Sequence, residues 1–278
     1  MGGSTAVVYK VCPRGCRKPG CVAVKVPKED LGSNEADVHA AITKAVKGTE
    51  DEHHFNKMLR VEPSKTGPIL TTEFEAGRTL EVELEEKSIS RDEWKGIVFQ
   101  VLHILLLAQE IIPGFSHNDF HAGNIILAPN TGKRVKHRCT TLTKNFDISI
   151  VPKRIVRIID FGSSTANAKR FQTSYGVRNF KNQIGNKFVD FARFATLSVY
   201  YCTRRERIAE YPSWYAEWLE FLSRWFDPRF FINGNATSTF ITQNGQRYLP
   251  AGVKWLNTWY GPTSKYSLEN VLEDAYFE

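Results

Sequence analysis

His117-Asn-Asp-Phe-His-Ala-Gly-Asn124 (HNDFHAGN) places two histidines, an aspartate and an asparagine around a single glycine. An apolar, strand-like run (Ile-Ile-Leu) follows directly, so the eight residues are predicted to form a loop. Three interpretations are open: a metal site, a polar turn, or a loop that carries catalytic side chains. Each interpretation requires different companions elsewhere in the chain.

A metalloprotease-type site is disfavoured. His117 and His121 have the four-residue spacing of a zinc-binding helix, but no glutamate follows the first histidine. Gly123 and the strand behind it also argue against a helix at this position.

The composition is that of an ordinary globular chain. It has 278 residues, of which 42% are hydrophobic and 24% charged. No uninterrupted apolar run reaches the roughly 18 residues of a membrane span, and the first residues lack the pattern of a secretory signal. We therefore expect one domain (residues 1–278), a cytoplasmic or nuclear location (host cell or virion for a viral protein), and no membrane partner. The odd number of cysteines, five, predicts reduced thiols.

The net charge is +7, and much of the excess lies in residues 131–154. A solvated basic insertion is the favoured interpretation, and acidic or phosphorylated ligands are the alternative. We do not expect a nucleic acid as a direct ligand.

Two halves differ in pattern. Residues 1–75 hold four strand-like runs (6–11, 21–26, 55–61 and 69–74) and one helix, which Ser33 and Asn34 can cap. Residues 76–278 hold a helix from Ser90 to the Pro113-Gly114 stop, two short strands (124–127 and 155–159), and aromatic helices after residue 211. This predicts an α+β fold with an antiparallel N-terminal lobe (1–75) and a mainly helical C-terminal lobe (76–278). We expect the aromatic repeat to be core packing.

Phosphoryl transfer needs a cation for the phosphates, oxygen ligands for magnesium, and a carboxylate that orients the acceptor hydroxyl. The chain supplies them in order. Lys25 ends a Val-Ala-Val-Lys strand, and Glu35 opens the next helix. Asp119 and Asn124 stand five apart, and Asp160-Phe-Gly ends a strand.

This set resembles the protein-kinase superfamily, from residue 3 to the closing helix near residues 267–277. The resemblance implies that Lys25 holds the α- and β-phosphates of ATP and that Glu35 pairs with it. Asp119 would orient the substrate hydroxyl. Asn124 and Asp160 would coordinate Mg²⁺, with Mn²⁺ as an alternative.

The resemblance also assigns the nucleotide pocket. Thr72 takes the gatekeeper position, and the Glu73 carbonyl and Glu75 amide would meet the adenine edge. The remaining nucleotide-binding residues that it implies are Gly3, Ala6, Val8 and Ala23. Asp190 resembles the buried aspartate that braces the catalytic loop.

The chain departs from the usual pattern in its first strand and in the catalytic loop. Alanine stands where the third loop glycine is expected, and the glycine loop is short. Asn118 replaces the arginine that commonly needs a phosphorylated activation loop, which predicts activity without that phosphorylation. No Ala-Pro-Glu follows Asp160, as in divergent kinases including haspin.

His121 stands where serine/threonine kinases usually have lysine. The histidine resembles the one found at this position in haspin-like kinases and aminoglycoside phosphotransferases. It would either donate to the γ-phosphate or bond to a neighbouring carbonyl. Cys21 and the Asn34-Glu35 start of the helix are similar to those of compact kinases from large DNA viruses.

The expected function is an ATP- and magnesium-dependent protein serine/threonine kinase, acting as a monomer. We expect a protein substrate, with basic or nucleic-acid-associated proteins as candidates. A small-molecule phosphotransferase and a pseudokinase scaffold are the alternatives. We do not expect structural zinc at Cys12, Cys16 and Cys21, because their spacing fits no standard finger and a fourth ligand is not evident.

Overall fold

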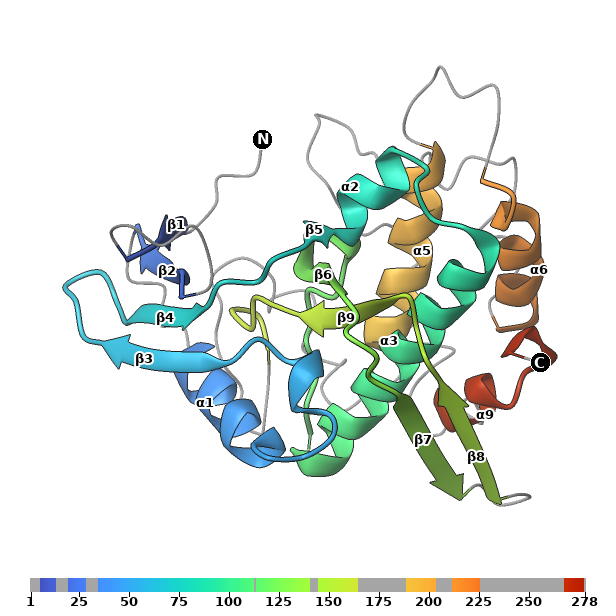
Figure 1. The fold of residues 1–278 in the computed structure, drawn as a ribbon, viewed down its shortest axis with the longest axis horizontal. Helices are drawn as coiled ribbons and strands as arrows, with labels where there is room; N and C mark the ends of the chain where they lie inside the picture. Colours follow the sequence, from blue (N-terminus) through green and yellow to red (C-terminus); the bar gives the residue numbers. More distant parts are fainter. Residues whose placement is uncertain are drawn as a thin grey trace.

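The N-terminal lobe is built on a four-stranded antiparallel sheet in the order β1-β2-β4-β3 (Figure 1). The computed structural model describes residues 6–13, 20–28, 35–112, 114–140, 145–164, 189–203, 212–225 and 268–277. The strands of this sheet are β1 (Ala6–Val11), β2 (Val22–Pro27), β3 (Met58–Glu62) and β4 (Ile69–Glu73). Helix α1 (Glu35–Val46) packs beside the sheet and buries Val38, Ile42 and Val46, which recur every four residues along one face.

The C-terminal lobe is mainly helical, as predicted. Its helices are α2 (Leu80–Glu85), α3 (Arg91–Ile111), α5 (Val189–Thr203), α6 (Tyr215–Trp225) and α9 (Leu268–Leu272), followed by the short η5 (Ala275–Phe277). A small sheet, β5-β6-β9, lies between the lobes and consists of β5 (Arg78–Thr79), β6 (Ile125–Pro129) and β9 (Arg154–Ile158). Together the two lobes confirm the predicted α+β fold class.

Helix α3 is the central element of the C-terminal lobe (Figure 1). Ser90 caps it by accepting a hydrogen bond from the Glu93 backbone amide, at the predicted helix start. Within the described residues it is long and apolar enough to span a membrane by composition, yet 67% of that stretch is buried against the rest of the protein. It is therefore packed as a core helix.

The aromatic residues of α6 and its neighbours form the core of this lobe, as the repeat predicted. Trp94 of α3 stacks on Trp214 with ring centroids 4.2 Å apart, and Trp218 meets Trp94 edge-on. The indole nitrogens of the two α6-side tryptophans donate to the Ile89 carbonyl and to Ser198 Oγ, so their polar atoms are satisfied inside the core.

The basic insertion is a β-hairpin, β7 (Val135–Thr140) and β8 (Asn145–Ile150), and its description as a solvated loop is only partly right. Val135 is buried, and Ile150 lies against α3 at Gly96. At the end of the insertion, Lys153 and Arg154 both pair with the buried Glu93, and Arg154 also reaches Glu83. These two cations are structural because two buried carboxylates require compensation.

The prediction of reduced thiols is wrong for Cys12 and Cys21, which form a disulfide. Strands β1 and β2 pair with Val11 opposite Val22. That register brings the next residues of the hairpin, Cys12 and Cys21, within 4.1 Å of each other at their Cα atoms. Both sulfurs are thereby removed as thiolate ligands, while Cys16 lies outside the described residues, as do Ser33 and Asn34.

One segment of the N-terminal lobe is anchored on the C-terminal lobe. It comprises residues 51–56 and includes the short helix η1 (Glu52–His54); we call it the anchor segment. The Asn56 amide donates to the Ile158 carbonyl at 3.2 Å, and Phe55 forms a parallel bridge with Ile158. The N-terminal lobe therefore contacts β9, the strand that leads to Asp160.

Candidate active site

Lys25 lies at the centre of a three-residue charge cluster. Its Nζ is 2.7 Å from Glu35 Oε1, 2.8 Å from Glu35 Oε2 and 2.7 Å from Asp160 Oδ1. Burial alone would lower the pKa of Lys25, but the charges of Asp160 and Glu35 outweigh that effect and raise it. Lys25 is therefore a permanent cation, held in place by Glu35, the first residue of α1, and by Asp160, two residues after β9.

Asn124 and Asp160 meet because they flank two paired strands. Asn124 precedes β6 and Asp160 lies two residues after β9, and the strands run antiparallel with Ile125 opposite Ile158. The Ile159 amide donates to the Asn124 carbonyl at 3.0 Å, so the pairing continues to the strand ends. Asp160 adopts a left-handed backbone conformation with φ of 62°. An aspartate tolerates this conformation better than most residues, and here it turns the chain away from the strand.

The side chains of Asn124 and Asp160 suit a hard divalent cation. Asn124 Nδ2 donates to the Asp119 carbonyl at 2.9 Å, which fixes the amide with Oδ1 as its remaining acceptor. Burial raises the pKa of Asp160, but the Lys25 charge outweighs it and keeps the pKa below the ordinary value. A carboxylate and an amide oxygen fit Mg²⁺.

The residues predicted to line the nucleotide pocket share one face of the sheet. Opposed residues in antiparallel strands point the same way, and Lys25 is opposite Val8 on β1 and Leu70 on β4. Ala23 is opposite Thr72 on the same face. Ala6 lies two residues before Val8 on β1 and therefore also points to this face. Val8 is 62% exposed, so this apolar face is accessible beside the Lys25 ammonium group. Gly3 lies outside the described residues.

The linker between the lobes follows the predicted gatekeeper. Thr72 is buried, and its Oγ1 accepts from Asn56 Nδ2 at 3.2 Å. The Glu73 amide is engaged by the Lys57 carbonyl at 3.0 Å. The Glu75 side chain turns inward and pairs with Arg157. Burial raises the pKa of Glu75 even so. Only the backbone of Glu75 thus remains for the predicted adenine contact.

Asp119, the predicted catalytic carboxylate, lies between two basic side chains, Arg193 and His121. Arg193 Nη2 lies 3.1 Å from Asp119 Oδ1, and His121 Nε2 lies 3.7 Å from Asp119 Oδ2. Burial would raise the pKa of Asp119, but the His121 hydrogen bond and the Arg193 charge hold it well below its usual range. Asp119 is therefore ionised at neutral pH and stays ionised in mild acid.

His121 bonds within its own loop, and the structure favours the second of its two predicted interpretations, with an amide in place of a carbonyl. Its Nδ1 accepts from the Gly123 amide at 3.1 Å, so the proton of the neutral ring is on Nε2, which faces Asp119. A Cβ at Gly123 would lie 2.8 Å from His121 Cε1 and 2.8 Å from Glu81 Oε2. Any larger residue there would have to displace the imidazole, which folds back over the glycine.

The backbone of the loop is held from α5 by Asp190, as predicted. Its carboxylate accepts from the amides of His117 at 2.6 Å and Asn118 at 2.8 Å. His117 itself is fully buried between Phe120 and Phe161, with Nε2 on the Ile159 carbonyl at 3.1 Å. It is a packing residue of the loop.

Asn118 ties the catalytic loop to the segment after Asp160. Its Nδ2 donates to the Ser163 carbonyl at 3.0 Å and to the Ser116 carbonyl at 3.3 Å. Ser164 is buried with its Oγ 3.4 Å from the His117 carbonyl, which makes it a poor phosphate acceptor in this conformation. The hydroxyl residues that follow and are also candidate phosphate acceptors by sequence, Thr165, Thr173, Ser174 and Tyr175, lie outside the described residues.

Arg193 is the site residue that the sequence interpretation missed. Its guanidinium contacts both the Asn118 carbonyl and the Asp119 carboxylate. A signal was present: Arg193 follows Asp190 by three residues on α5, and residues three apart share a helix face. The sequence did not reveal that this face meets the catalytic loop.

Comparisons with known proteins agree with this geometry. Over 140 residues, 47% of this chain, it is 33% identical to probable kinase 098L of Invertebrate iridescent virus 3. The match covers 25% of that relative's length. This similarity supports the same architecture as the order of the elements described above.

The chain has a protein-kinase-like fold.

One solved structure, described as a kinase domain, aligns with 98% of this chain and 80% of its own, with 16% identity and a TM-score of 0.49. No protein-family model matches the chain. The structure brings Lys25, Glu35 and Asp160 into contact, and the functional roles of these residues stay predictions. The residues predicted to contact the nucleotide are on the N-terminal sheet, and the Asn124 amide and the Asp160 carboxylate lie beside neighbouring ends of β6 and β9.

Proposed function

We propose that this chain is an ATP- and Mg²⁺-dependent protein serine/threonine kinase that acts as a monomer. The observation that carries the proposal is the Lys25 ammonium group, held at 2.7 Å by both Glu35 and Asp160. A cation fixed between the two lobes, beside an apolar sheet face and an oxygen-ligand pair, suits a nucleoside triphosphate. The similarity to a probable kinase of an iridovirus supports the same activity and a viral origin.

Each residue has a defined task in this proposal. Lys25 binds phosphate oxygens, and Glu35 prevents its side chain from turning away. Asn124 and Asp160 hold Mg²⁺, which neutralises charge on the phosphates when bound. Asp119 accepts a hydrogen bond from the acceptor hydroxyl and aligns its oxygen with the γ-phosphate. Arg193 keeps the Asp119 carboxylate oriented, so most of the rate enhancement comes from positioning and charge.

Activity without activation-loop phosphorylation is part of the proposal. Asn118 already connects the catalytic loop to the Ser163 carbonyl by a neutral hydrogen bond. In the kinases that carry arginine there, the charge of that arginine needs a phosphate partner. We expect phosphatase-treated protein to keep its full transfer rate. A rate that falls with dephosphorylation and recovers on incubation with ATP would contradict this part.

A small-molecule phosphotransferase is the second candidate. The folded His121–Gly123 turn favours it, because it is the feature that this loop shares with such enzymes. Transfer of labelled phosphate from Mg-ATP would be compared for histones and casein against aminoglycosides and choline. Labelled serine or threonine in the proteins supports the kinase, and labelled small molecules alone would support the second candidate.

The test of the active site is Asp119→Ala, with Asp92→Ala as its control. Asp92 is an exposed carboxylate in the first turn of α3, outside the site. We expect Asp119→Ala to abolish phosphate transfer while circular dichroism and ATP binding are retained, and Asp92→Ala to transfer at the normal rate. Unchanged turnover in Asp119→Ala would overturn the mechanism.

A further inference from the structure

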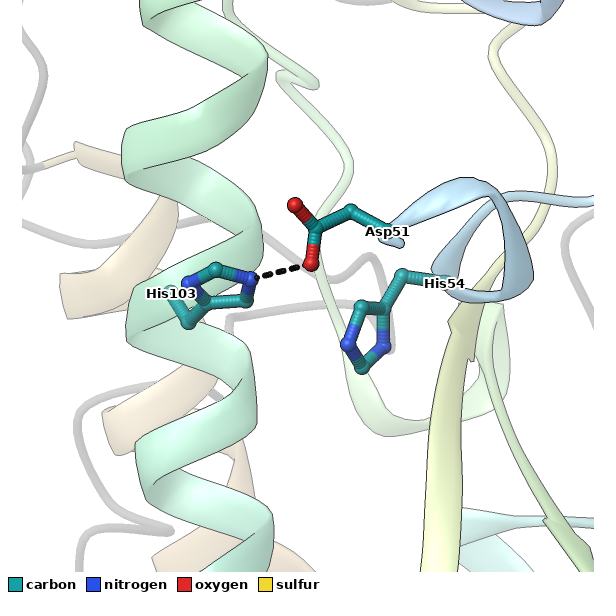
Figure 2. A group of neighbouring side chains, drawn as sticks. All are labelled: Asp51, His54 and His103. Carbon is teal, nitrogen blue, oxygen red and sulfur yellow. Dashed lines mark hydrogen bonds and ion pairs between the residues drawn. The ribbon is translucent and has the colours of Figure 1, made fainter. Parts of the chain in front are cut away.

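Three potential metal ligands meet where the anchor segment lies beside helix α3 (Figure 2). Asp51 and His54 belong to the anchor segment, and His103 projects from α3 (Figure 2). One ligand atom from each residue lies within 4.8 Å of the others. Both histidines are buried, whereas Asp51 is partly exposed. The two lobes thus each contribute side chains to one polar cluster.

His54 is oriented as a metal ligand would be. Its Nδ1 lies 2.9 Å from the Val156 carbonyl, which can only accept, so Nδ1 carries the ring proton. The lone pair is then on Nε2. Within the described part of the chain, Nε2 is buried and has no hydrogen-bond partner.

His103 is held by outer contacts of the same kind. Its Nε2 lies 2.9 Å from Asp51 Oδ1, and its Nδ1 lies 2.9 Å from Nδ1 of His137 on β7. One hydrogen lies between the two Nδ1 atoms, because one ring must donate and the other accept. When His103 Nδ1 carries this hydrogen, His103 Nε2 has a lone pair that can bind a cation. His137 then accepts at Nδ1 and carries its own proton on Nε2. The change is a tautomer shift in two neutral rings and leaves the net charge the same.

An ordinary hydrogen-bonded cluster would account for Asp51 and His103 but not for His54. A buried acceptor without a partner costs about 1–3 kcal/mol, which a native structure normally avoids. Two imidazole nitrogens and one carboxylate oxygen are a donor set of zinc and similar ions, whereas Mg²⁺ prefers oxygen ligands. Backbone and imidazole partners at the outer nitrogens are the usual second shell of such ligands.

We propose that Asp51, His54 and His103 bind a divalent transition-metal ion, with Zn²⁺ as the expected ion. The ion fastens the anchor segment to α3 and so joins the N-terminal lobe to the C-terminal lobe. This inference does not depend on phosphoryl transfer, because its ligands are separate from Lys25, Asp119 and Asp160.

The test is direct binding of Zn²⁺ and Co²⁺ to full-length protein that was purified without a histidine tag and treated with chelator. We expect one equivalent of either ion to bind. Bound Co²⁺ should show the visible absorption of a low-coordinate nitrogen and oxygen site, without the near-ultraviolet band of cobalt–thiolate bonds. A strong thiolate band would assign the ion to cysteines and overturn the proposal.

Variants assign the ligands. We expect His54→Gln and His103→Gln to weaken Zn²⁺ binding about 100-fold or more, because even loss of an outer partner costs about 10–100-fold. His39→Gln is the matched control: this buried histidine contacts the Asn56 carbonyl outside the cluster, so its variant should bind Zn²⁺ normally. Circular dichroism checks that each variant folds. If a histidine variant does not fold, Asp51→Asn replaces it as the ligand variant, because Asp51 is partly exposed. Absence of binding in the parent protein, or unchanged affinity in the folded ligand variants, would refute the site.

Discussion

Arg193 provides the sharpest test of the catalytic geometry, because it contacts Asp119 without belonging to the catalytic loop. The perturbation is Arg193→Ala. It removes the ion pair to Asp119 Oδ1 at 3.1 Å and the hydrogen bond to the Asn118 carbonyl. The loop backbone stays braced, since Asp190 holds the amides of His117 and Asn118 independently. The variant should therefore fold while its Asp119 side chain loses orientation.

The size of the effect follows from exposure. A hydrogen bond to a charged group contributes about 1.5–3 kcal/mol, but the Asp119 side chain is 40% exposed and water screens it. We therefore expect the activation free energy to rise by about 1–2 kcal/mol, which corresponds to a roughly 5- to 30-fold decrease in kcat. KM for ATP should be unchanged, because Lys25 and Asp160 lie apart from Arg193.

The assay is steady-state transfer of labelled phosphate from Mg-ATP to a protein acceptor, as a function of pH. In Arg193→Ala the pKa of Asp119 should rise toward its ordinary value, so the acidic limb of kcat/KM should move to higher pH. Arg193→Lys keeps the charge and should recover part of kcat. Arg91→Ala removes an exposed pair with Glu217 and is the neutral control. A folded Arg193→Ala protein with parental kcat and pH profile would refute the positioning role.

Three further predictions concern the phosphate cluster, the core and pH. In Gly162→Ala, the new Cβ would lie 3.1 Å from Asp160 Oδ1, and we expect kcat/KM to fall roughly 10- to 100-fold at unchanged urea stability. Arg154→Leu leaves two buried carboxylates short of a partner and should cost about 3 kcal/mol in urea unfolding; a loss below about 1 kcal/mol would show that Lys153 suffices. Burial lowers the pKa of His53 and His137 from 6.5 to about 4, so the unfolded chain binds more protons between these values. When the pH is lowered from 7 to 5, the free energy of unfolding of the metal-free protein, measured by urea titration, should fall by roughly 1–2 kcal/mol per histidine. His137→Phe should remove part of this pH dependence.

The parts predictable from the sequence are those set by local pattern and by motif. Lys25, Glu35 and Asp160 could be placed together because their types and order matched a known set, and the structure brings all three within hydrogen-bond distance. The capped start of α3 at Ser90 follows from a side chain and a backbone amide three residues apart. Such features need no knowledge of distant partners.

The features that could not be predicted depend on register or on contacts between distant elements. The Cys12–Cys21 disulfide follows from the pairing of β1 with β2, which the chain's composition does not reveal. Arg154 looked like one charge in a basic stretch, because its partners Glu83 and Glu93 lie more than 60 residues earlier, on helices α2 and α3. His54 and His103 gave no motif, since their proximity depends on how the two lobes pack.

Two backbone connections between the lobes, seen among the described residues, have a mechanical consequence. The N-terminal lobe is tied to the rest by the linker after β4 and by the anchor segment on β9. Two fixed points define a hinge line, and any opening of the molecule is a rotation about it. Strand β1 lies two strands from β4, about 10 Å, so a turn of roughly 10° moves it by nearly 2 Å. The strand that carries Ala6 and Val8 therefore sweeps furthest, while the carboxylates beyond β9 stay almost still.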